Sequence, residues 1–175
     1  MVAKMSLNWK QIEFPGDSVH NWTDLKKLCD TSELSALERS VYVIRIGRPF
    51  SFQYPNGYSP VAYIGKGKAQ QRITSHIKGW ITNLSKRVPS LKISIWYCEP
   101  RVKYHGDNCE EIKADLMQRF TSKYGSLPLR NRQSQWNNYE YSYGEGDLKV
   151  LHPGKGSGYH WALTPLPNSH FYRLK

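Results

Sequence analysis

The chain has no long apolar segment. None of the hydrophobic runs in its 175 residues approaches the ~18 residues that indicate a membrane-spanning helix. Residues 1–9 also lack the apolar core of a secretory signal. These absences exclude a transmembrane helix and predict a cytoplasmic protein that has no membrane partner.

Cysteine is scarce as well. The three cysteines, at positions 29, 98 and 109, are scattered and form no CxxC pair. An odd, scattered set fits a reducing compartment and excludes both a disulfide framework and a zinc site of the CxxC type. The chain also lacks internal repeats, low-complexity segments and the GxxxxGK[ST] spacing of a phosphate-binding P-loop.

Acidic residues are the third shortage, because 14 aspartates and glutamates stand against 25 lysines and arginines. The formal net charge is +11 and the isoelectric point is near 9.6. Residues 40–106 hold eleven basic residues and a single acid, Glu99, so this stretch carries nearly the whole excess. Such a balance favours a polyanionic partner, of which nucleic acid is the commonest, over a protein that is merely basic and soluble.

The residues that are present predict an α+β fold. With 39% hydrophobic residues the chain can bury a core. β-Branched or alternating runs predict strands, and apolar residues at i, i+4, i+7 and i+8 predict helices. Sequential strands joined by a loop pair antiparallel, so we expect a small three-stranded, mainly antiparallel sheet flanked by helices. The expected strands are 41–46, 61–64 and 91–97, and the expected helices are 23–39 (with a possible break near 30–32), 69–84 and 108–123.

Three regions follow from this pattern. Residues 1–38 are an N-terminal arm and helix, residues 39–132 are the core, and residues 133–175 are a C-terminal extension packed on the core. The extension is rich in aromatic residues, glycine and proline. We expect it to be mostly irregular, with one or two short strands.

Two tyrosines and a basic turn lie where the expected strands meet the next helix. Tyr42 lies mid-strand and Tyr63 lies on the adjoining strand, so the two rings can approach each other, although each also fits an ordinary sheet aromatic. The run Gly65-Lys66-Gly67 lets the backbone approach a phosphate and adds a positive charge. Its alternative is a simple turn with a solvated lysine.

Arg72 and His76 follow on the expected helix, four residues apart, and so share one face. Arginine binds phosphate bidentately, and histidine donates to it or assists proton transfer. Phosphodiester hydrolysis needs an activated water, a neutralised phosphate and a stabilised leaving oxygen, and a tyrosine is a general base where cations depress its pKa. The pair alone also fits a polar helix flank.

In order and spacing these pieces resemble the GIY-YIG nuclease domain, over residues 39–132. That family has VY or IY on its first strand and YIG on its second. An arginine and a histidine follow on a helix, a glutamate lies on a later helix, and many members close with an LPxxN-like segment. The matching residues are Val41-Tyr42, Tyr63-Ile64-Gly65, Arg72, His76 and the segment 127–131.

The resemblance implies an endonuclease that hydrolyses phosphodiester bonds of double-stranded DNA with a single Mg²⁺ or Mn²⁺ ion. The roles that it implies are general base (Tyr42 or Tyr63), contacts to the scissile phosphate (Lys66 and Arg72), proton transfer (His76) and orientation of the active site (Asn131).

The same comparison places Lys113 where the family has its metal-binding glutamate. Leu116 and Phe120 fix the register of the helix, and ~100° per residue puts Lys113 inside the apolar arc. Glu110 falls at the edge of that arc and Glu111 on the far side. An ammonium repels a divalent cation, and burying an unpaired charge is costly.

Four explanations of Lys113 stay open. In the first, which we favour, the chain is an inactive variant of a nuclease with lysine where glutamate belongs. In the second, the lysine is natural and the protein only binds DNA. In the third, Glu110 supplies the carboxylate from one turn back. In the fourth, Lys113 is a snorkelling surface lysine on a helix whose phase is misassigned.

Among the settings of the family, the sequence favours a type II restriction-like enzyme, because no zinc or helix-turn-helix signature is present. Alternatives are a non-catalytic DNA-binding module, or a repair, homing or RNA-directed nuclease of the same fold. We expect site recognition in residues 48–60 and 130–152, and a homodimer if the DNA site is palindromic. The further residues expected on DNA are Arg48, Lys68, Lys78, Arg130 and Arg132.

Overall fold

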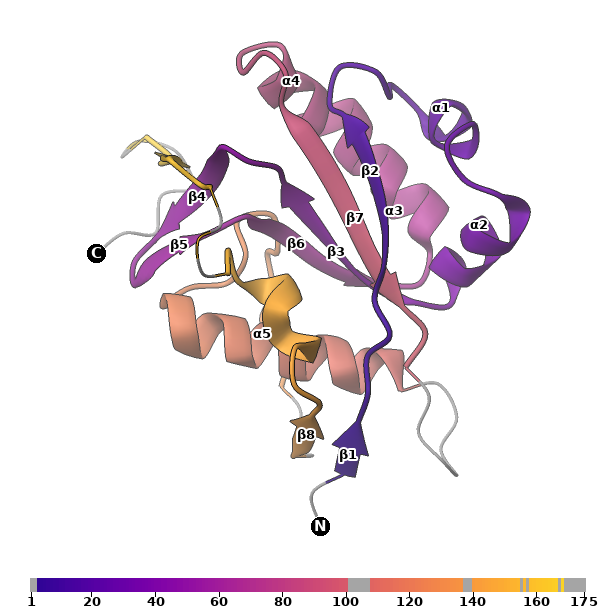
Figure 1. Ribbon diagram of the computed structural model, residues 1–175, viewed down its shortest axis with the longest axis vertical. Helices are drawn as coiled ribbons and strands as arrows, with labels where there is room; N and C mark the ends of the chain where they lie inside the picture. Colours follow the sequence, from indigo (N-terminus) through magenta and orange to yellow (C-terminus); the bar gives the residue numbers. More distant parts are fainter. Residues whose placement is uncertain are drawn as a thin grey trace.

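A four-stranded sheet forms the centre of the molecule (Figure 1). Every neighbouring pair in it runs antiparallel, which confirms the α+β class and the expected antiparallel pairing. The computed structural model describes residues 3–100, 108–136, 140–154, 156, 158–166 and 168. In their order across the sheet, the strands are β2 (Lys10–Pro15), β7 (Lys92–Cys98), β3 (Val41–Ile46) and β6 (Val61–Lys66).

The sheet has one strand more than the three that the sequence predicted, because the N-terminal arm contributes β2. In β2 the side chains of Ile12 and Phe14 are buried and their neighbours are exposed, as expected of a strand with one covered face. Pro15 and Gly16 directly follow Phe14. Because proline and glycine usually mark turns, the short alternation before them was not recognised as a strand. The strand β3 lies inside the sheet, and all of its residues are buried.

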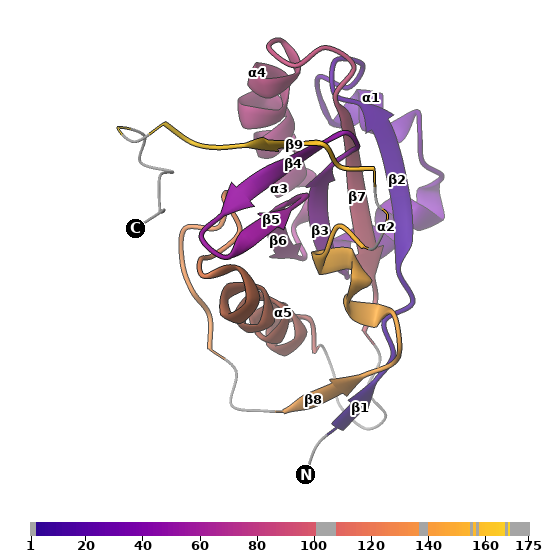
Figure 2. The same ribbon diagram turned by 60° about the vertical axis from the view of Figure 1, so that its left-hand side comes forward.

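Helices cover both faces of the sheet (Figures 1 and 2). The helices α1 to α4 gather on one face, and α5 crosses the other face beside β6 and β3. The expected helix over 23–39 is broken where 30–32 suggested, because Asp30 caps a new helix by accepting the Glu33 N–H. The helices are α1 (Trp22–Lys26), α2 (Thr31–Glu38), α3 (Ala69–His76), α4 (Thr82–Ser85) and α5 (Cys109–Tyr124).

The expected helix over 69–84 contains a π-helical turn. After α3 comes η1 (Ile77–Ile81), in which Gly79 has non-helical angles of φ −93° and ψ −105°, and α4 completes the segment. Ile73 and Ile77 of the predicted apolar stripe are fully buried. The non-helical angles of Gly79 show that the segment is kinked between α3 and α4.

Short accessory strands connect the C-terminal extension to the rest of the molecule. One strand of the extension, β8, runs parallel to β1, and another, β9, runs parallel to β4 of a small hairpin. Within the part of the chain that the structure describes, no helix combines the length and apolarity needed to cross a membrane. The remaining elements are β1 (Ala3–Met5), β4 (Phe50–Tyr54), β5 (Gly57–Ser59), β8 (Tyr141–Tyr143), η2 (Asp147–Leu151) and β9 (Trp161–Leu163).

Candidate functional site

Tyr42 and Tyr63 lie side by side on β3 and β6. Their ring centroids are 6.1 Å apart, and the strand register places Gly65 opposite Tyr42. A side chain has no room at Gly65, because a Cβ atom there would lie 2.5 Å from the Tyr42 ring and 2.6 Å from the Tyr63 ring. The glycine of the YIG motif therefore allows the two rings to pack against the strand.

The two tyrosine hydroxyls differ in their surroundings. Tyr42 is fully buried, and its hydroxyl has no hydrogen-bond partner of acceptable geometry among the described residues. Burial, together with the neighbouring Tyr63, raises the pKa of Tyr42. Tyr63 is partly exposed, and Arg72 donates from Nη1 to its hydroxyl at 3.4 Å. Tyr63 is therefore the better placed of the two to accept a proton from water.

His76 packs on Tyr63, with ring centroids 4.2 Å apart. The indole N–H of Trp80 donates to Nδ1 of His76 at 3.0 Å, so the neutral imidazole carries its proton on Nε2. Burial, with Arg130 and Arg72 nearby, lowers the pKa of His76 to about 4. At neutral pH His76 is therefore an uncharged hydrogen-bond donor through Nε2.

Lys66 lies on the opposite face of the sheet from the tyrosines. Cross-strand partners share a face, and Lys66 pairs with Val41 whereas Tyr63 pairs with Ile44. On its own face Lys66 forms an ion pair with Glu110 of α5, and this contact lowers the pKa of the Glu110 carboxyl. The candidate residues therefore straddle the edge strand β6 and do not share one face.

The two faces meet at a small hollow at the end of β6, near the end of α2 and the starts of α3 and α5. Its volume is about 140 Å³. The side chains of Lys66, on β6, and Arg72, on α3, both line this hollow. The cations that line this hollow are Arg39, Lys66, Lys68 and Arg72. Glu38 lines the hollow as well, and Arg39 and Lys66 form ion pairs with Glu99 and Glu110. An anionic group entering the hollow therefore meets a lining in which cations outnumber the one carboxylate.

Lys113 is buried on α5, as the phase of the helix predicted. Its exposed fraction is 8%, which contradicts a surface lysine on a misassigned helix. Lys113 has no ion pair or hydrogen bond within the described ranges. Burial, with the positive charges of Arg72 and Lys66 nearby, lowers its pKa.

The residues around Lys113 do not fit a divalent cation. An ammonium group occupies the inward position, and the side chain of Glu110, 57% exposed, is held by Lys66 and Gln135. In the described portion of the chain, no three histidine, cysteine, aspartate or glutamate side chains cluster in a way that could hold a metal ion. The expected site needs only one carboxylate, so it is Lys113 itself that makes the chain as it stands unfit for Mg²⁺ or Mn²⁺ there.

Asn131 acts on the backbone of β6. Its Oδ1 accepts the Ile64 N–H at 2.9 Å, and its Nδ2 donates to the Ile64 carbonyl at 2.8 Å. Because β6 is an edge strand, these bonds replace those of a missing neighbouring strand. Asn131 therefore holds the segment between Tyr63 and Gly65 in place and orients the site indirectly.

The other basic residues expected on DNA differ in their distance from the hollow. Lys68 lines it. Arg130 lies near His76, whose pKa it lowers, and Arg132 in turn lies near Arg130, whose pKa it lowers in addition to burial. Lys78 is exposed on η1. Of these basic residues, Lys68 is the one that lines the hollow together with Lys66 and Arg72.

The expected recognition segments lie mostly away from the hollow. Arg48 lies over the ring of Tyr159, 5.9 Å from its centroid. It follows the end of β3 opposite to the Val41–Lys66 pair, roughly 17 Å along the strand. The segment 130–152 starts beside β6 and continues to β8 and η2, and its residues 137–139 lie outside the described residues.

Two residues that shape the site, Trp80 and Glu38, were not identified from the sequence. Trp80 was expected only in the apolar stripe, although its spacing of four from the histidine allowed the contact. Glu38 caps α3, because its carboxylate oxygens accept the backbone N–H groups of Ala69 at 3.0 Å and Gln70 at 2.6 Å. The residue before α3, Lys68, has φ +46° and makes no cap of its own.

Comparisons with known proteins identify no relative of this chain. The chain matches no protein-family model, no curated protein and no solved structure. The resemblance to the GIY-YIG domain therefore rests on the motif residues and on their positions around β6.

Proposed function

We propose that this chain has the site of a GIY-YIG-type, restriction-like endonuclease of double-stranded DNA. In this proposal cleavage needs a carboxylate at position 113, and with Lys113 the chain binds the DNA backbone without cutting it. One observation carries the proposal. Lys66 and Arg72 line a single hollow, Arg72 donates to the hydroxyl of Tyr63 just outside that lining, and residue 113 of α5 is buried close to both cations.

Each residue then has a role that follows from its surroundings. Tyr63 accepts the proton of the attacking water, because it is partly exposed and in contact with a guanidinium. Lys66 and Arg72 neutralise the phosphate from the two sides of β6. His76 donates a hydrogen bond from Nε2 in its neutral form. Tyr42 is buried against Tyr63 and limits the positions that its ring can take.

The charge of the molecule supports a nucleic-acid partner. Nearly the whole net charge of +11 comes from residues 40–106, the stretch that contains β3, β6 and α3. A protein that neutralises phosphates with lysine and arginine gains affinity through the release of counterions. Duplex DNA is the partner that the family resemblance implies, and RNA or single strands are the alternatives.

A non-cutting DNA-binding module is the second candidate, and Lys113 is the observation that favours it. Lys66, Arg72 and Lys113 bring three positive charges to the site, and Glu110 is the carboxylate that acts on Lys113. Cations alone suffice to bind a phosphate. In this case a carboxylate at position 113 would not restore cleavage.

Plasmid cleavage in Mg²⁺ separates the two candidates. The Lys113→Glu variant should cut, and the chain as it stands should not. The matched control is Lys123→Glu, the same exchange at an exposed position of the same helix, and it should stay inactive. If no variant cuts although all bind duplex DNA, the nuclease proposal fails and the binding module replaces it.

A further inference from the structure

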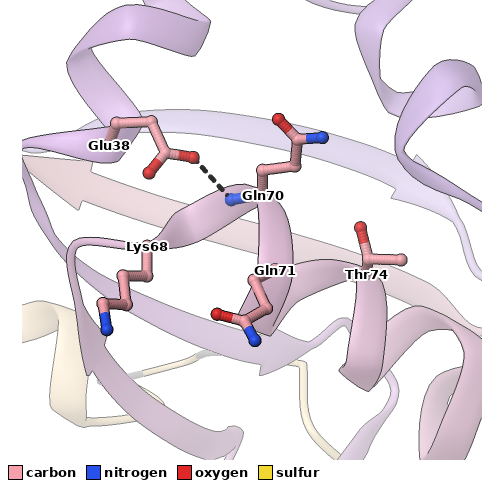
Figure 3. A pocket seen from close by; sticks show the side chains of 5 residues that line it. All are labelled: Glu38, Lys68, Gln70, Gln71 and Thr74. Carbon is pink, nitrogen blue, oxygen red and sulfur yellow. Dashed lines mark hydrogen bonds between the residues drawn. The ribbon is translucent and has the colours of Figure 1, made fainter.

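A wider, open hollow lies beside the cation-lined one, between the end of α2 and the first turns of α3 (Figure 3). It is a shallow depression that is open to solvent, with a volume of about 670 Å³. The two hollows share Glu38 and Lys68, so they are neighbouring parts of one depression. The wider hollow is lined by Glu38, Lys68, Gln70, Gln71 and Thr74.

The chemical character changes from one hollow to the next. The small hollow is lined mainly by cations, whereas the wider one presents two amides and a hydroxyl beside a single lysine and a single carboxylate. The groups of DNA have a matching arrangement. Its phosphates bind cationic side chains, and the base edges next to the phosphates bind amide and hydroxyl groups.

Glu38 makes the wider hollow unsuitable for a phosphate. Its carboxylate already accepts the N–H groups of Ala69 and Gln70, so the start of α3 offers no free pair of donors to an anion at this point. In the wider hollow Lys68 alone opposes the negative charge of Glu38, whereas four cations oppose it in the small hollow, so a phosphate is favoured in the small one. Besides Lys68, the groups that remain for a ligand are uncharged, and they suit the edge of a base.

Gln71 is the amide best placed to contact such an edge. In Figure 3 its side chain points to the same side of α3 as the ammonium of Lys68, whereas Gln70 points away from them. Gln71 makes no hydrogen bond with any described residue, unlike Gln53 and Gln135, whose amides are bound within the protein. Its donor and acceptor are therefore both available.

We propose that Gln71 reads the adenine of an A·T base pair next to the phosphate that Lys66 and Arg72 hold. A glutamine amide offers one donor and one acceptor, which match N7 and N6 of adenine in the major groove. Site recognition then lies in the first turns of α3 and not in residues 48–60 or 130–152. This proposal rests on the proposed function, because it needs duplex DNA at the adjoining hollow.

Binding of the full chain to duplexes selected from a random library, in EDTA, tests the proposal. One position of the selected sequence should favour A·T by about ten-fold, and Gln71→Ala should reduce this to less than about two-fold. The affinity of both proteins for random duplex DNA should be the same. Exchange of that adenine for 7-deazaadenine, which lacks the N7 acceptor, should weaken the original chain and leave Gln71→Ala unaffected.

The matched control is Gln11→Ala, an exposed glutamine on β2, which should keep the preference for A·T. A preference that survives Gln71→Ala, or indifference of the original chain to 7-deazaadenine, overturns the role of Gln71 and leaves the proposed function intact. If the chain does not prefer duplex DNA to RNA, or if Arg72→Met does not weaken binding, the proposed function fails and this proposal falls with it.

Discussion

At the scale of single residues, the site depends on contacts that control protonation as well as packing. Gly65 leaves the space in which the rings of Tyr42 and Tyr63 lie. Trp80 occupies Nδ1 of His76, and burial keeps that imidazole neutral. His76 can therefore donate a hydrogen bond but cannot take a proton at Nδ1, and Tyr63 is left as the group that can act as a base.

The role of Trp80 can be tested with Trp80→Phe, which keeps a ring near Phe52 and removes the indole N–H. We expect ¹⁵N NMR to find the Nε2–H tautomer of His76 in the original chain and a mixture of tautomers in the variant. The pKa of His76 should rise, because its neutral form loses a hydrogen bond that favours it. Trp136→Phe, at a position 84% exposed, should change neither quantity. An Nδ1–H tautomer in the original chain would contradict this account.

At the scale of elements, β6 is the strand on which the site is built. It carries Tyr63, Gly65 and Lys66, and it leads directly into α3. The strand β3 pairs with one edge of β6, and on its other edge the side chain of Asn131 binds Ile64. The placement of the tyrosines and of Lys66 therefore depends on a contact outside the sheet.

Asn131→Ala should loosen β6. The variant leaves the buried N–H and C=O of Ile64 without their side-chain partner, which should lower the free energy of unfolding by about 2–3 kcal/mol. Urea denaturation measures that loss, and hydrogen exchange should accelerate at the Ile64 amide more than at the amides of β3. Asn83→Ala, at an exposed position of α4, serves as the control. Equal acceleration at Ile64 and throughout β3 would show that Asn131 supports the whole fold and not β6 in particular.

Elements whose signals are local could be predicted from the sequence. The run 41–46 coincides with β3, and the phase of α5 predicted the inward position of Lys113. Tyr63 and Lys66 are three residues apart on one strand. Because side chains alternate along a strand, this spacing also predicts that the two residues lie on opposite faces of the sheet. The grouping of Tyr42 with Tyr63 followed from their adjoining strands.

Contacts between distant segments could not be predicted. Glu38 caps a helix that begins 31 residues later in the chain, and Asn131 binds a residue 67 positions away. Neither side chain belongs to a local capping or turn pattern from which its partner could be predicted. The pairing of β2 with β7 was missed for a related reason, because only two buried residues mark β2 before Pro15 and Gly16 end it.

At the scale of the whole molecule, two half-buried histidines make the fold sensitive to acid. Burial is the main cause that lowers the pKa of His76 and His152 to about 4 each, below the ~6.5 of an unfolded chain. The unfolded state therefore binds more protons between these two values. The free energy of unfolding should be at its full value above about pH 6.5 and should fall as the pH decreases toward 4.

Urea unfolding between pH 4 and pH 7.5 measures this effect. We expect His76 to account for a loss of up to about 3 kcal/mol over that interval. His76→Gln should flatten the profile, and Asn83→Ala, at an exposed position without a titratable group, should leave it unchanged. A profile of the same slope in His76→Gln and the original chain would contradict a half-buried, neutral His76.

Under the proposed function, the net charge of +11 favours binding to DNA whether or not the chain cuts it, so binding alone does not test the central claim. Mg²⁺-dependent plasmid cleavage by Lys113→Glu and Lys113→Gln does. Both variants remove the ammonium, and only the first supplies a carboxylate. Our account predicts cleavage by Lys113→Glu alone, and its loss when Tyr63→Phe is added. Cleavage by the original chain or by Lys113→Gln, or none by a Lys113→Glu protein that folds and binds duplex DNA, would contradict it.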